Sequence, residues 1–145
     1  MNHVNVALRA YLFTLLSNLR RIVLPLETAQ EALTIRIRSA VYIGKRVQRL
    51  NKVLAKSQKA LDDVYNVMNN ARDGIEFRHA RKAFHQSCDA IDSLKWAIEA
   101  AENEWLHALT MIDEARARLA EVDTPTMRKR LAEIDSVEKT LKMMD

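Results

Sequence analysis

A seven-residue repeat of apolar side chains runs through the first half of the chain, from Leu12 to Met68. Every seventh position in this range is apolar, and neighbouring apolar residues widen the stripe. Such a repeat keeps one side of a helix facing a partner helix over many turns, which is typical of a coiled coil. The nine positions are Leu12, Leu19, Leu26, Leu33, Ala40, Val47, Leu54, Leu61 and Met68.

The second half of the chain carries a repeat with the same period. Between the two repeats, residues 69–74 read Asn-Asn-Ala-Arg-Asp-Gly, the only strong turn signal near the middle of the chain. The two halves are therefore predicted to form long helices that fold back on each other. The second repeat consists of Phe77, Phe84, Ile91, Ile98, Trp105, Ile112 and Leu119, and a companion set three residues on consists of Ala80, Ser87, Leu94, Ala101, Ala108, Ala115 and Val122.

Two prolines divide the helical pattern further. Pro25 removes one helical hydrogen bond and predicts a kink or short break near it. Pro125 is tolerated in the first turn of a new helix. Either Asp123 or Thr124, which precede it, can cap that helix. We expect one elongated domain over 1–145, with an N-terminal helix over 1–24, a first arm over 26–70, a second arm over 75–122 and a C-terminal helix over 125–143.

The predicted fold is all-α: a long antiparallel two-helix coiled-coil hairpin, with the third, C-terminal helix making a three-helix bundle at the terminal end. If Met68 lies opposite Phe77, Gly44 falls near Ala101, where small residues let the two backbones approach closely. The N-terminal helix then extends beyond the second arm. There it offers Tyr11, Phe13 and Leu16 to the third helix.

Charge is distributed unevenly between the two arms. Residues 1–74 carry 12 Lys and Arg against 5 Asp and Glu, whereas residues 75–123 carry 6 against 10. Antiparallel arms of opposite sign predict ion pairs across the hairpin that fix its register. The chain has one cysteine and no run of about 18 apolar residues, so we expect no intrachain disulfide, no membrane span and a cytoplasmic location.

The sequence contains two pairs of glutamate and histidine at the spacing found in helical metal sites. Glu76 precedes His79 and Glu104 precedes His107 by three residues. Both pairs lie on one predicted helix about 42 Å apart, so they cannot converge on one ion. We expect no metal, no cofactor, no small-molecule substrate and no enzymatic activity.

A line of basic residues on the first arm stands out from this background, and we call it the basic ridge. Its members fall within a band of about 80° on a helical wheel, nearly opposite the apolar stripe. No acidic residue interrupts residues 32–61. The line is either a solvated outer face or a surface that binds phosphates, anionic lipids or an acidic protein. The ridge consists of Arg38, Lys45, Arg49, Lys52, Lys56 and Lys59.

Two further segments are candidates for contact with partners. The turn presents Arg72, Asp73 and Glu76 at the hairpin tip. The N-terminal helix has no acidic residue before Glu27, so it is either the core of the terminal bundle or a segment that inserts shallowly into a membrane surface.

These features predict a non-enzymatic helical module for protein–protein interaction, acting as an adaptor, assembly factor or inhibitor. Apolar residues outside the main stripe indicate a further partner along the first arm, which is either another protein or a second copy in a homodimer. They are Ile35, Val41, Val53 and Val67. The alternative is an accessory factor that binds nucleic acid or an anionic membrane surface through the basic ridge.

Overall fold

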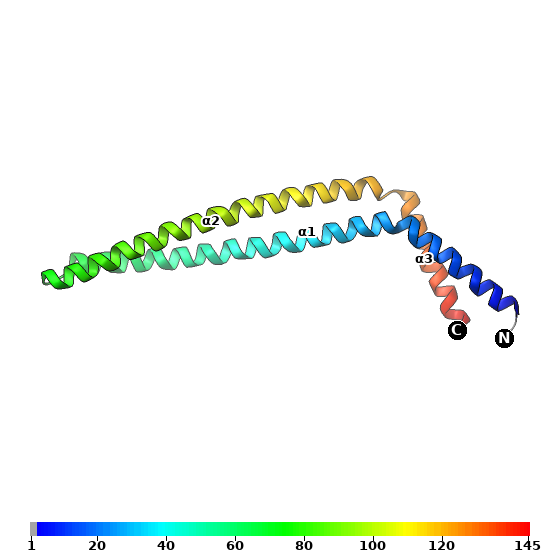
Figure 1. The fold of residues 1–145 in the computed structure, drawn as a ribbon, viewed down its shortest axis with the longest axis horizontal. Helices are drawn as coiled ribbons and strands as arrows, with labels where there is room; N and C mark the ends of the chain where they lie inside the picture. The colour runs from blue at the N-terminus through cyan, green and yellow to red at the C-terminus, as the bar shows by residue number, and fades with distance from the viewer. Residues whose placement is uncertain (1–2) are drawn as a thin grey trace. The chain divides into compact units, whose positions relative to one another are not determined.

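The computed structural model describes residues 3–145, and these residues form three α-helices. Helix α1 spans His3–Asn69, α2 spans Gly74–Val122 and α3 spans Pro125–Met144 (Figure 1). No strand occurs within this range. The predicted all-α fold is confirmed, and α1 packs with both α2 and α3.

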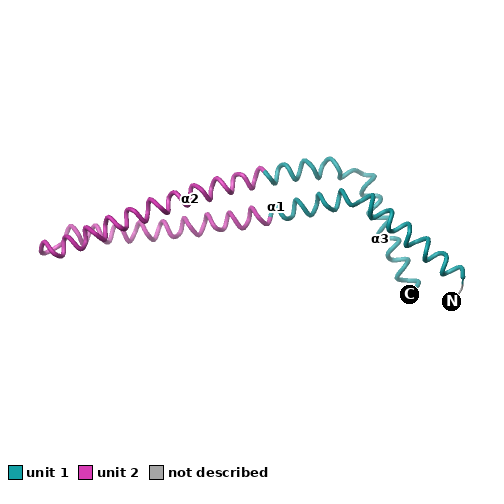
Figure 2. The backbone as a smooth tube through the Cα atoms, viewed as in Figure 1, with its two compact units in different colours: residues 1–37, 111–145 teal, residues 38–110 magenta. Residues whose placement is uncertain are grey.

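The chain divides into two compact units (Figure 2). Unit 1 comprises residues 1–37 and 111–145, so it combines segments of all three helices. Unit 2 comprises residues 38–110 and contains the rest of α1, the turn and most of α2.

Within unit 1, α1 remains helical through Pro25. The helix changes direction in the blue part of this unit (Figure 1) but is not interrupted. Val23 and Leu26, on either side of the proline, have no exposed surface at all. Their burial stabilises the helix where the proline removes a backbone hydrogen bond.

The core of unit 1 lies between α1 and α3. It buries apolar side chains that both helices present to each other, with Leu12, Leu15, Met127 and Leu131 at its edge. Tyr11 and Phe13, which were expected to face α3, are exposed instead, because α3 covers the side of α1 that carries Leu16. The core residues are Leu16, Leu19, Val23, Ile134, Val137 and Leu141.

The start of α3 is held by local side-chain contacts. The Thr124 hydroxyl accepts a hydrogen bond from the backbone N–H of Met127 at 3.2 Å, and Pro125 occupies the first turn. Arg128 donates two hydrogen bonds to the Asp123 carboxylate, at 2.7 and 2.8 Å. These bonds lower the pKa of Asp123 below its usual range. Of the two candidate caps, Thr124 is therefore the one that caps α3.

In unit 2, α1 and α2 run antiparallel. Two contacts show this, because the residue number is higher on α1 where it is lower on α2. A Cβ placed on Gly44 would lie 3.1 Å from the Trp105 indole nitrogen, and the rings of Tyr65 and Phe84 pack 5.9 Å apart. Trp105 is one helical turn beyond Ala101, the expected neighbour of Gly44. The register is shifted because the first turn of α2 lies past the end of α1, and Ala80 is the first buried residue of α2.

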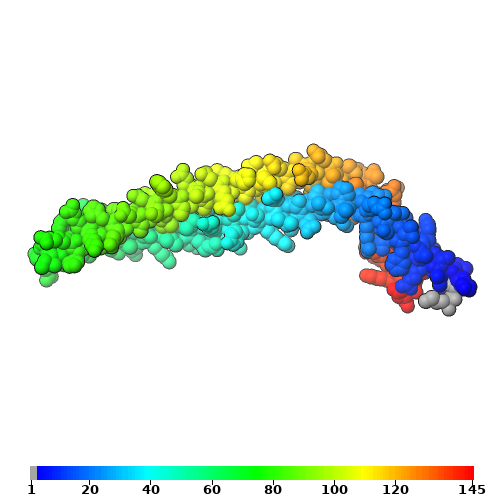
Figure 3. All heavy atoms as spheres, viewed as in Figure 1, coloured from blue at the N-terminus to red at the C-terminus, as the bar shows by residue number. Residues whose placement is uncertain are grey.

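The residues of unit 2 that are at least partly buried follow the predicted stripes. On α1 they recur mostly at spacings of three and four from Ala40 to Met68, with Gly44 directly after Ile43. On α2 the same spacings run from Ala80 to Ala101, with adjacent pairs at residues 83–84 and 87–88. The side chains fill the space between the two helices (Figure 3). Two members of the predicted stripe are exposed: Trp105 at 37% and Phe77 at 41%. Phe77 is exposed because it lies in the first turn of α2.

Candidate functional site

All six residues of the basic ridge lie on α1 within unit 2, and all six are exposed. None of them forms an ion pair with any residue that the structure describes. Their charges are therefore not neutralised by α2. A row of unpaired cations on one helix creates a local positive potential that attracts anionic groups.

The expected network of ion pairs between the two arms is largely missing. Among the described residues, one ion pair joins α1 to α2: Arg46 lies 3.8 Å from Glu104, and both side chains are about half exposed. Neither residue belongs to the ridge. A single exposed pair of this kind contributes little stability, so the apolar stripes rather than charges set the register in unit 2.

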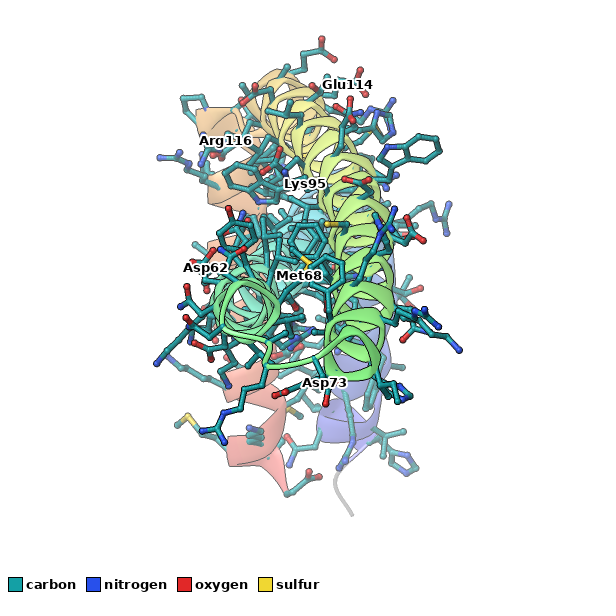
Figure 4. All side chains as sticks on the ribbon, turned by 90° about the vertical axis from the view of Figure 1, so that its left-hand side faces the viewer. Asp62, Met68, Asp73, Lys95, Glu114 and Arg116 are labelled. Atoms are coloured by element: carbon teal, nitrogen blue, oxygen red, sulfur yellow. The ribbon has the colours of Figure 1, made fainter. Side chains whose placement is uncertain are left out.

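The acidic residues predicted at the hairpin tip have a structural role. The Asp73 carboxylate accepts a hydrogen bond from the Glu76 backbone N–H at 2.8 Å, and Glu76 in turn accepts one from the Arg72 backbone N–H at 3.1 Å. These contacts cap the start of α2. Figure 4 shows Asp73 at the turn and Met68 between the two helices. The cap engages both carboxylates, whereas the Arg72 side chain extends into solvent.

The two glutamate–histidine pairs stand apart on the surface of α2. All four side chains are exposed, and Glu104 faces Arg46 rather than a histidine. No group of three potential metal-ligating residues occurs in the described part of the chain.

Exposed apolar side chains are the second prominent surface feature. Ile35, Val41, Val53 and Val67 are all exposed, at 49–54% of their surface. The sequence reasoning missed Trp96, which is 79% exposed. Its position two residues before Ile98 places it opposite the packed stripe of α2, and that spacing is the signal that reveals its exposure.

The N-terminal part of α1 exposes apolar residues on both sides of α3. The larger ones are Leu8, Tyr11, Phe13, Ile22 and Leu24. Arg20, which belongs to the same segment, forms an ion pair with Glu138 of α3, and Arg9 forms one with Asp145, the residue after α3. A helix that is apolar on most of its faces is typical of a segment that other protein covers.

Comparisons with protein families, with curated proteins and with solved structures give no match to this chain. None of the helices within residues 3–145 combines the length and the hydropathy needed to cross a membrane.

Proposed function

We propose that this chain is a non-enzymatic helical interaction module that works in the cytoplasm as an adaptor, assembly factor or inhibitor of another protein. In this proposal α1 and α2 form a coiled-coil hairpin, and α3 closes its terminal end as part of a three-helix bundle. The spacing of partly buried residues by three and four in unit 2 supports the coiled coil. The single cysteine supports a reducing compartment.

The observation that carries the proposal is the set of exposed apolar side chains on α1 outside the packed stripe. Val53 and Val67 lie fourteen residues apart, which is two seven-residue repeats and places them on one face of the helix. Each is about half exposed. Covering such side chains with a partner removes apolar surface from water and is favourable by about 25 cal/mol per Å².

Photo-crosslinking in an extract of cells that express this protein tests the proposal. A photoreactive phenylalanine analogue replaces Val53, and the control places the same analogue at Asn51, an exposed polar position on the same helix. We expect a discrete crosslinked protein from position 53 and none from position 51. A chain that has the same mass in buffer and in extract, and that gives no crosslinked product at either position, would contradict the proposal.

The unpaired ridge favours a second candidate function, binding of nucleic acid or an anionic membrane surface. Six cations on one helix supply affinity by releasing counterions from phosphates. Apart from Tyr42, aromatic residues do not alternate with these cations, so any nucleic-acid binding would not depend on base sequence. An acidic protein partner would bind the same face. In that case, removing the ridge charges would mainly slow association with that one protein, and binding of polyanions would be unimportant.

A further inference from the structure

Two adjoining hollows lie between α1 and α2 in unit 1 (Figure 2), and together we call them the α1–α2 groove. The smaller hollow, of about 210 Å³, is lined by Ala29, Ala32 and Arg36 of α1 and by Ala115 and Arg118 of α2, among others. The larger hollow, of about 420 Å³, shares Ala29, Ala32 and Arg118 with the smaller one. Alanine side chains are too short to fill the space between two helices, so the groove stays open where they meet.

Arg36 occupies a position where the packed stripe of α1 would carry an apolar residue. It lies seven residues after Ala29 and seven before Ile43, both of which are buried. The seven-residue repeat therefore turns Arg36 toward α2. Arg36 is exposed through the open groove and forms no ion pair with any residue that the structure describes. At this point the chain places a cation beside the groove instead of an apolar contact between the helices.

The α1–α2 groove carries an excess of positive charge. Arg21, Arg36 and Arg118 line it and are exposed. Glu114 lines it as well, and none of these four side chains forms an ion pair within residues 3–145. Three arginines against one glutamate leave the groove net positive, so it attracts an anionic ligand.

The part of the groove beside Pro25 offers apolar surface and hydrogen-bond acceptors. Leu24, Pro25 and Val122 line this part, and Leu24 is 56% exposed. A proline at position 25 leaves the Arg21 carbonyl without the backbone donor that a regular helix supplies. The Thr28 hydroxyl also lines the groove and forms no hydrogen bond with a described residue, whereas other threonine hydroxyls of α1 donate to the carbonyl four residues earlier.

These three properties together distinguish between anionic ligands. Inorganic phosphate would pair with the arginines but leave the apolar surface uncovered. A fatty acid would match both the charge and the apolar surface, but it has no N–H group for the free acceptors. An acidic peptide supplies carboxylates, an apolar side chain and backbone N–H donors within a few residues.

We infer that the α1–α2 groove binds an acidic peptide segment of a partner protein. Two carboxylates of the segment pair with Arg36 and Arg118. An apolar side chain between them covers Leu24 and Val122, and a backbone N–H donates to the Arg21 carbonyl. This inference rests on the proposed interaction function and names the chemistry of one partner.

Selection from a phage library of short random peptides tests the inference, with the purified full chain as the target. We expect enrichment of sequences in which aspartate or glutamate flanks an apolar residue. The counter-target carries Arg36→Gln and Arg118→Gln, which remove two cations from the groove, and it should not enrich these sequences. Both arginines are exposed, so circular dichroism should show an unchanged helix content.

Fluorescence anisotropy with a labelled copy of the selected peptide then measures the effect of single charges. Arg118→Gln should raise the dissociation constant about tenfold, because it removes a charge-assisted hydrogen bond. Arg116→Gln is the matched control and should change the constant by less than about twofold, since Arg116 is exposed on the same helix but does not line the groove. Glu114→Gln should lower the constant several-fold, because it removes a carboxylate that repels the peptide.

A further variant separates the groove from the basic ridge. Joint replacement of Arg49, Lys52 and Lys56 with glutamine removes three ridge cations from unit 2. At about 0.15 M salt this change should leave peptide affinity within about twofold, because exposed charges are screened over short distances. A loss equal to that of Arg118→Gln would place the peptide on the ridge and overturn the inference.

A selection without acidic sequences, or one in which the counter-target enriches the same peptides, would overturn the inference. So would equal losses from Arg116→Gln and Arg118→Gln. Decanoate that displaces the peptide and binds as tightly would identify a fatty-acid site instead. A chain that binds no peptide in the groove but crosslinks a protein from position 53 would overturn this inference alone. A chain that binds the peptide and crosslinks nothing would instead count against the proposed role of the exposed apolar side chains.

Discussion

Single side chains at the helix ends hold the places where the chain reverses. Asp73 and Glu76 satisfy backbone N–H groups at the start of α2, and Thr124 does so at the start of α3. The first backbone donors of a helix have no partner inside the helix, so a side-chain oxygen at this position stabilises the helix end. These hydrogen bonds give Asp73 and Glu76 a local structural role, and contact of the tip with a partner stays a prediction.

Thr124→Ala tests the cap of α3. Loss of the hydroxyl leaves the Met127 N–H without its hydrogen-bond acceptor, and we expect the free energy of unfolding to fall by about 1 kcal/mol in thermal or urea unfolding. Thr126→Ala is the control, since Thr126 lies just inside the same helix and is exposed. It should leave stability unchanged or raise it slightly, because alanine favours helix. Equal losses in both variants would contradict the capping role.

At the scale of helices, burial determines where α1 and α3 meet and how α1 continues through Pro25. Val23 and Leu26 are fully buried, whereas Leu24, between them, is 56% exposed. Position on the helix therefore separates a core leucine from a surface leucine only two residues away. Proline costs a hydrogen bond, but the packing on either side of it keeps the helix continuous.

Two leucine variants measure the contribution of this burial. Leu26→Ala should destabilise the chain by about 2–5 kcal/mol, because it leaves a cavity among well-packed side chains. Leu24→Ala should change stability by about 0.5 kcal/mol or less, since it removes a largely exposed side chain. Chemical denaturation followed by circular dichroism gives both values. Similar effects of the two substitutions would show that Leu26 is not a core residue.

At the scale of the whole molecule, the unpaired cations of the ridge and the exposed apolar side chains are two surface features that a partner could bind. The chain has a formal net charge of +4, and the six ridge cations make no ion pair within the described residues. Some of the exposed apolar residues, such as Val41 and Val53, lie in the same stretch of α1 as the ridge, and others lie elsewhere on α1 and on α2. The two kinds of side chain are chemically distinct, so variants can separate a polyanion partner from an apolar one.

Replacing Arg49, Lys52 and Lys56 together with glutamine tests the ridge. If the ridge binds phosphates, affinity for DNA, RNA or anionic vesicles should fall by several-fold or more. For nucleic acid, the slope of log affinity against log salt should flatten by about 0.7–0.9 per lost contact. The fold should lose little stability, since all three residues are exposed.

The control for the ridge variant makes the same change in net charge elsewhere. Arg116, Lys129 and Lys142 are exposed and lie outside the ridge, so their joint replacement with glutamine should reduce binding much less. Equal losses in the two triple variants would mean that net charge, not the ridge, drives binding. No binding by the parent chain at about 0.15 M salt would mean that the ridge is only a solvated face.

The sequence alone determined the all-helical fold and the turn near residues 69–74, and it restricted the cap of α3 to Asp123 or Thr124. These features depend on local rules: apolar residues at seven-residue spacing, turn-forming residues, and a hydroxyl before a proline. The same rules placed the ridge residues on an exposed face, because a helix fixes the direction of each side chain from its position.

Tertiary structure decided the register and the choice of faces. Trp105, not Ala101, lies against Gly44, because the first turn of α2 extends past α1. Tyr11 and Phe13 do not lie on the side of α1 that α3 covers, so they are exposed. The N-terminal part of α1 is apolar on several faces, so periodicity alone does not say which face a neighbour buries. That choice depends on the combined packing of both helices, which no local pattern encodes.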